Sequence, residues 1–93
     1  MTSPISITFY GRAGCHLCDE TRARLESLVG NPFEFDIVEV DIESNDDLHK
    51  RYLERIPILE HGGVVLSELG ATKDQLVKLM AGVASIARDD NGD

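Results

Sequence analysis

The chain has 93 residues, a length that fits one small domain with a modest hydrophobic core. Its net charge of −8 argues against nucleic acid and against an anionic membrane surface as partners, because both attract basic patches. No segment is long and apolar enough to span a membrane, and the start of the chain lacks the basic residues and the apolar run of a signal peptide. We therefore expect a cytoplasmic protein that acts as a monomer.

The first predicted elements are a strand and a helix separated by a glycine-containing turn. Apolar and polar residues alternate over residues 5–10, which predicts the strand, and Gly11 and Gly14 interrupt the pattern. Helical periodicity follows over residues 15–29 and ends at Gly30. The face predicted to be buried consists of Leu17, Thr21, Leu25 and Leu28. On the exposed side, Glu20–Arg24 and Arg22–Glu26 have the spacing of ion pairs.

The only two cysteines, Cys15 and Cys18, lie at this junction of strand and helix. The first N–H groups of a helix are free and its dipole is positive there, so a sulfur at that point is stabilised as a thiolate. A cysteine three positions further on is within reach for a disulfide. Such a bridge encloses too few residues to restrict the unfolded chain much. The spacing therefore favours a redox pair.

Two other interpretations of the cysteines stay open. A zinc site needs four ligands, of which this pair supplies two, and the three histidines are scattered. Two inert core cysteines would fit a buried helix face better than a position between Gly14 and the acidic residues Asp19 and Glu20.

A second strand is predicted over residues 33–42. Its apolar residues change phase within the segment, which suggests a bulge or burial on both faces. The intervening positions are acidic, and we interpret them as a solvated rim at the edge of a sheet. A divalent-metal patch is the alternative, but alternating strand positions spread the carboxylates over two faces.

The rest of the chain alternates helical and strand patterns. Ser44 or Asn45 caps a second helix whose buried stripe is Leu48, Tyr52 and Leu53. Strands over residues 57–60 and 64–66 flank a Gly-Gly hairpin signal.

The final predicted helix begins with a capping box, Thr72 to Gln75. Its apolar face is Leu76, Leu79, Met80, Val83 and Ala87. We expect a single domain over residues 1–88, followed by a disordered acidic tail over residues 89–93.

The predicted order is βαβαββα, an α/β fold with a four-stranded mixed sheet and helices on both faces. With a Cys-x-x-Cys after the first strand and a proline opening the third, this order resembles the thioredoxin fold in its short glutaredoxin form. Three segments carry the resemblance. Residues 9–18 look like the glutaredoxin active-site turn, Arg55-Ile56-Pro57 looks like the threonine-valine-proline segment, and residues 70–74 look like the glycine-glycine…aspartate segment.

The resemblance implies a thiol–disulfide oxidoreductase. Cys15 would attack a disulfide of a protein or of a glutathione adduct, and Cys18 would resolve the mixed disulfide. The residues implied in substrate binding are Arg12, Ile56, Pro57, Gly70 and Asp74, with the Ile56–Pro57 bond cis. No metal or resident cofactor is implied, and glutathione is a candidate co-substrate.

The sequence also departs from the glutaredoxin pattern. His16-Leu17 replaces proline-tyrosine between the cysteines, Arg55 replaces threonine, and Ala71 replaces the second glycine. We expect the methyl group of Ala71 to crowd glutathione, and therefore expect thioredoxin to reduce the disulfide better than glutathione does. The alternative function is a module that binds a soft metal (copper or zinc) or an iron–sulfur cluster through the same cysteines.

Overall fold

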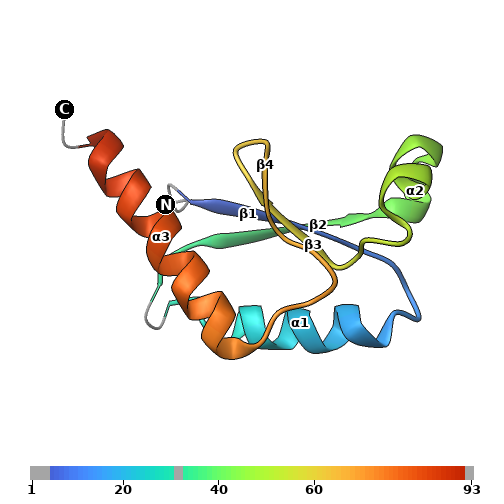
Figure 1. Cartoon of the computed structure of the whole chain (residues 1–93), viewed down its shortest axis with the longest axis horizontal. Helices are drawn as coiled ribbons and strands as arrows, with labels where there is room; N and C mark the ends of the chain where they lie inside the picture. Colours follow the sequence, from blue (N-terminus) through green and yellow to red (C-terminus); the bar gives the residue numbers. More distant parts are fainter. Residues whose placement is uncertain (1–4, 31–32, 92–93) are drawn as a thin grey trace.

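The computed structural model describes residues 5–30 and 33–91 (Figure 1). The elements follow the predicted order βαβαββα, with a short 3-10 helix inserted after the second strand. Their bounds are Ser6–Gly11 (β1), His16–Glu26 (α1), Asp36–Asp41 (β2), Ile42–Ser44 (η1), Asp46–Tyr52 (α2), Ile58–His61 (β3), Val64–Ser67 (β4) and Lys73–Asn91 (α3).

The four strands form one mixed sheet in the order β2-β1-β3-β4. β1 pairs in parallel with β2 and antiparallel with β3, so that Phe9 lies between Glu39 and Leu59. Gly62 and Gly63 both have positive φ and turn the chain from β3 into the antiparallel strand β4. The mixed sheet predicted from the sequence is therefore confirmed.

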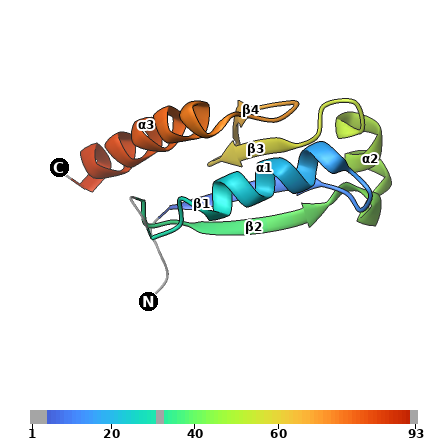
Figure 2. The same cartoon turned by 90° about the horizontal axis from the view of Figure 1, so that it is seen from below.

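Helices lie on both sides of the sheet. α1 runs along one side with the start of α3 beside it, and α2 lies on the other side at one end of the sheet (Figures 1 and 2). Alternate residues of β1 point to these two sides. The guanidinium of Arg22 in α1 lies 5.2 Å from the ring centroid of Phe9, whereas the ring of Tyr10 packs against Tyr52 of α2 with centroids 4.9 Å apart.

The main hydrophobic core fills the space between the sheet and the helices α1 and α3. Its fully buried large side chains include Ile7, Phe9, Leu25, Leu28, Leu59, Leu76 and Met80. Cys18 belongs to the same core. One of the two cysteines is therefore built into the hydrophobic core.

The expectation for residues 33–42 was wrong in its details. β2 is shorter, pairs with β1 in an unbroken register and is exposed along most of its length, because it is an edge strand with one neighbour. The buried apolar residues Phe35 and Ile42 lie just outside it, before the strand and in η1. The apolar pattern changes phase because residues 33–42 include these buried positions outside the strand as well as the strand itself. The register shift of the sheet occurs instead between β3 and β4, at Leu59 and Glu60.

The predicted helix starts are confirmed, with two differences in length. The side chain of Asn45 accepts hydrogen bonds at the start of α2, and Thr72 and Gln75 form the reciprocal capping box of α3. α1 ends at Glu26, earlier than predicted. Leu53 lies just past the end of α2 and is 37% exposed, so it is not part of the buried stripe.

α3 continues to Asn91 and therefore includes the first three residues of the predicted acidic tail. The physical reason is that no glycine or proline occurs between Gly82 and Gly92 to end the helix. The last two tail residues, 92 and 93, lie outside the described part of the chain, and the side chain of Ala87 does too. Across residues 5–30 and 33–91, no helix has both the length and the apolar character needed to cross a membrane.

Candidate active site

Cys15 occupies the N-cap of α1, where the turn after β1 enters the helix. Its backbone is extended, and its Sγ accepts a hydrogen bond from the backbone N–H of Cys18 at 3.1 Å. The sulfur thus takes the place that a serine or aspartate oxygen usually holds at an N-cap. Cys15 is partly exposed. After reduction, the helix N-terminus and the N–H hydrogen bond would favour the thiolate form of this sulfur over the thiol.

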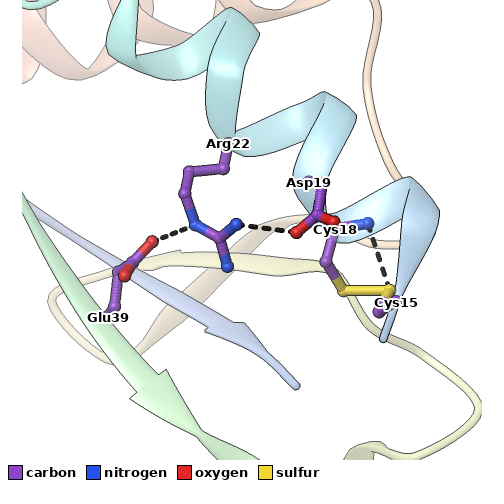
Figure 3. A network of polar contacts seen from close by, with 5 residues as sticks. All are labelled: Cys15, Cys18, Asp19, Arg22 and Glu39. Carbon is purple, nitrogen blue, oxygen red and sulfur yellow. Dashed lines mark hydrogen bonds and ion pairs between the residues drawn. A yellow bond between two sulfur atoms is a disulfide. The ribbon is translucent and has the colours of Figure 1, made fainter. Parts of the chain in front are cut away.

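Cys18 lies one turn further along α1 and is completely buried. The two sulfurs are joined in a disulfide, and the Cα atoms are 5.1 Å apart (Figure 3). Gly11, the last residue of β1, faces this sulfur. A Cβ atom added at Gly11 would lie 3.3 Å from Cys18 Sγ and 3.1 Å from an edge carbon of the Phe9 ring. The sequence shows Gly11 as a turn residue, but its close approach to the sulfur is a tertiary contact.

Pro57 precedes β3, and its peptide bond with Ile56 is cis. β1 and β3 are antiparallel with Tyr10 opposite Ile58, so the register continued by one residue places Pro57 across from Gly11. Both Ile56 and Pro57 are buried. The structure therefore brings this predicted segment to the end of the sheet that carries the cysteines.

Leu17, between the two cysteines, is not part of the buried face and is 39% exposed. It packs over Gly70, because a Cβ atom built at Gly70 would lie 3.0 Å from a methyl carbon of Leu17. Gly70 has a φ of 95°, and Leu69 before it has a φ of 61°, which is uncommon for a residue with a side chain. The predicted substrate-binding residue Gly70 is thus adjacent to the Cys-x-x-Cys helix, and Leu17 covers it.

Arg55 joins the proline segment to the loop before α3. Its backbone oxygen accepts a hydrogen bond from the N–H of Leu69 at 3.0 Å. Its guanidinium donates to both carboxylate oxygens of Glu68, at 2.9 and 2.7 Å. These hydrogen bonds hold the pKa of Glu68 below its usual value. The residue that replaces the family's threonine therefore ties two of the predicted site segments together.

Ala71 lies in the hydrophobic core, and its expected effect on glutathione stays a prediction. It is only 7% exposed. The reason is that the chain turns inward at this point to start α3, and the carbonyl oxygen of Ala71 accepts a hydrogen bond from Arg24 at 3.2 Å. The neighbouring residue Gly70 is the one that Leu17 covers.

The basic residues of α1 do not form the predicted i,i+4 pairs; each makes a contact outside the helix, and Arg22 also pairs with Asp19 within it. Arg22 donates to Asp19 at 2.9 Å and to Glu39 on β2, and not to Glu26 (Figure 3). Burial lowers the pKa of Arg22, but the hydrogen bonds to the two carboxylates more than offset this and leave it raised. Arg24 bonds Ala71 instead of Glu20. The contacts with Glu39 and Ala71 join distant segments and have no local sequence signal.

Arg12 and Asp74, two further predicted substrate-binding residues, make no hydrogen bond or ion pair with the cysteines among the described residues. The side chain of Arg12 is 40% exposed and its nearest anionic partner is Glu43, at 3.8 Å. Asp74 is exposed in the first turn of α3, and no hydrogen bond or ion pair joins it to the cysteines within the described residues.

Two surface depressions border the site. One, of about 310 Å³, is lined by both charge signs, including Arg12, Arg22, Glu39 and Asp41. The other, of about 550 Å³, lies between β4 and α3 and includes Gly70. In the chain segments that the structure describes, no three residues among His, Cys, Asp and Glu are grouped so that they could hold a metal ion.

Fold and site together define a thioredoxin-fold protein with a Cys-x-x-Cys disulfide at the start of its first helix. Residues 6–81 match the family model described as Glutaredoxin-like domain (DUF836), and the chain belongs to this family. No curated protein matches the sequence.

Several solved structures share the fold. Protein Ne2328 from Nitrosomonas europaea, solved by NMR, is 28% identical with a TM-score of 0.69, and the match covers 86% of this chain and 95% of that one. A malarial protein is 15% identical with a TM-score of 0.60, covering 86% and 97%. A mutant thioredoxin from Halobacterium salinarum is 19% identical with a TM-score of 0.59, covering 84% and 73%.

Proposed function

We propose that this protein is a thiol–disulfide oxidoreductase of the cytoplasm, with Cys15 as the attacking thiolate and Cys18 as the resolving thiol. The observation that supports this best is the asymmetry of the pair: Cys15 is partly exposed and receives an N–H hydrogen bond, whereas Cys18 is fully buried. An incoming disulfide can reach the first sulfur only. Thiol exchange depends on such access and on the thiolate form of the attacking sulfur.

The proposed substrates are disulfides of proteins or mixed disulfides of glutathione. The Cys15 thiolate attacks one substrate sulfur, forms a mixed disulfide and releases the other sulfur as a thiolate. Cys18 then attacks Cys15, the new disulfide forms between the two cysteines, and the substrate leaves reduced. The buried Pro57 lies at the same end of the sheet, and Arg12, Ile56, Gly70 and Asp74 are the further residues that we propose to contact substrate.

Trapping of the mixed disulfide tests this assignment of roles. Cys18→Ser leaves the attacking thiolate without its resolving partner, so we expect it to accumulate a stable adduct with a disulfide-containing protein. The matched variant Cys15→Ser is expected to trap none, because Cys18 is buried. Equal trapping by both variants would overturn the assignment. Brown, iron-containing protein after anaerobic purification, with no trapping, would favour the iron–sulfur alternative.

A further inference from the structure

The hydroxyl group of Thr21 is the buried polar side-chain atom that lacks a hydrogen-bond partner among the described residues. Thr21 is 1% exposed. A threonine inside a helix usually satisfies its hydroxyl by donating to the carbonyl oxygen four residues earlier, which here belongs to Leu17. This hydroxyl does not do so. An unpaired buried hydroxyl is unfavourable, so its presence calls for a physical reason.

Cys18 lies three residues before Thr21, on the same inward face of α1. Residues at this spacing are neighbours on a helix surface, with Cβ atoms about 5–6 Å apart. Both side chains are buried, Cys18 completely and Thr21 with 1% exposure. On the side of the sheet, Gly11 lies so near that a Cβ atom added to it would be 3.3 Å from the sulfur. In the disulfide, Cys18 Sγ is bonded to Cys15 Sγ. After reduction the same sulfur becomes a buried thiol or thiolate that needs a polar neighbour.

We propose that Thr21 is a positioning residue that donates a hydrogen bond to Cys18 Sγ once the disulfide is reduced. The hydroxyl is unpaired in the oxidised state and paired in the reduced state, so it shifts the equilibrium of the couple toward the dithiol. The two sulfurs then have separate donors, the Cys18 N–H for Cys15 and the Thr21 hydroxyl for Cys18. This inference rests on the proposed redox function.

The hydrogen bond acts in the resolving step. Cys18, as the thiolate, attacks Cys15 Sγ in the mixed disulfide, and a bond forms between these two sulfurs while the bond from Cys15 to the substrate sulfur breaks. The substrate leaves as a thiolate and takes up the proton that Cys18 gave up. Over the whole reaction the two cysteines lose two electrons and the substrate disulfide gains them.

The test is the redox equilibrium of the Cys15–Cys18 couple in dithiothreitol buffers. In Thr21→Val, which keeps the shape and removes the hydroxyl, we expect the ratio of reduced to oxidised protein to fall about tenfold. For a two-electron couple this is a change of ~30 mV toward more negative potential. Thr21→Ser keeps the hydroxyl and is expected to stay within about twofold of the parent. Thr8→Val, half-buried on β1 at a position that points away from α1, is the control and is expected to change nothing.

Urea unfolding of the oxidised variants gives a second measurement. Removal of an unpaired buried hydroxyl is expected to stabilise oxidised Thr21→Val relative to the parent protein, so a valine variant that is destabilised or fails to fold would contradict the inference. An unchanged redox ratio in Thr21→Val would also overturn it. A parent protein whose cysteines do not equilibrate with the buffer would instead refute the proposed function itself.

Discussion

Substitution of Gly11 by alanine tests the packing of the buried sulfur. The new Cβ atom would lie 3.1 Å from the Phe9 ring and 3.3 Å from Cys18 Sγ, closer than the ~3.5–4.0 Å of ordinary contacts. Neither neighbour can move easily, since the ring is buried in the core and the sulfur is fixed by the disulfide. Overpacking of this kind costs about 1–3 kcal/mol.

Part of this cost is offset in the unfolded chain. Gly11 does not have positive φ, so alanine fits its backbone and gains about 0.4–1 kcal/mol from lower unfolded-state entropy. We therefore expect oxidised Gly11→Ala to lose about 1–2 kcal/mol of unfolding free energy. For a domain of this size, each kcal/mol corresponds to roughly 4–8 °C in the melting temperature.

The assay is urea unfolding followed by circular dichroism, because the chain contains no tryptophan. Gly82→Ala is the matched control: Gly82 lies in α3 with nothing within 4 Å of an added Cβ, and we expect a gain of about 0.5–1 kcal/mol from helix propensity. The reduced form of Gly11→Ala is expected to lose less than the oxidised form, since the freed sulfur can rotate away. A gain in stability for Gly11→Ala as large as that for Gly82→Ala would show that the sulfur is not closely packed.

Two further predictions concern pH and the choice of reductant. Burial, and after it the nearby Glu60, raises the pKa of Tyr10, so the folded protein keeps a proton that the unfolded chain releases. Stability is therefore expected to fall as the pH rises above about 10. Urea midpoints between pH 9 and about 11 measure this fall, and Tyr10→Phe should make it smaller. The second prediction is the rate at which the oxidised protein is reduced, measured by stopped flow: we expect it to be slow with glutathione and faster with thioredoxin. The reasons are that Leu17 covers Gly70 and that the net charge of −8 repels the glutathione anion at distances below the screening length of ~8 Å. Fast reduction by millimolar glutathione that Arg12→Ala abolishes would contradict this expectation.

The fold and the centre of the site were predictable because their signals are local. The Cys-x-x-Cys after a strand, the Gly-Gly hairpin and the capping box at Thr72 each depend on a few adjacent residues, and all three appear where the sequence placed them. The order of elements follows from such signals, and the handedness and pairing rules then leave few topologies. The resemblance to glutaredoxins added the cis bond before Pro57, which spacing alone does not reveal.

The rest depends on contacts between distant segments. The helical pattern places Leu17 on the same side as the buried residues of the helix. It cannot show that Leu17 packs over Gly70 and not in the core, because Gly70 is distant in sequence. The ion pair of Arg22 with Glu39 spans a helix and a strand, and a rule for neighbours within one helix predicted Glu26 instead. The inward position of Ala71 likewise depends on where the chain enters α3.

The first turns of α1 are held on three sides, and in the proposed redox function this support would give the two cysteines a fixed frame. Cys18 anchors the inner face against β1, Leu17 packs over the loop before α3 on one flank, and Arg22 binds Glu39 of β2 on the other. Cys15 lies at the N-cap of the helix that these contacts hold in place. A site on a rigid element with such supporting contacts keeps its geometry through a reaction. We therefore expect the disulfide to form and break through rotation of the two cysteine side chains, without movement of the helix.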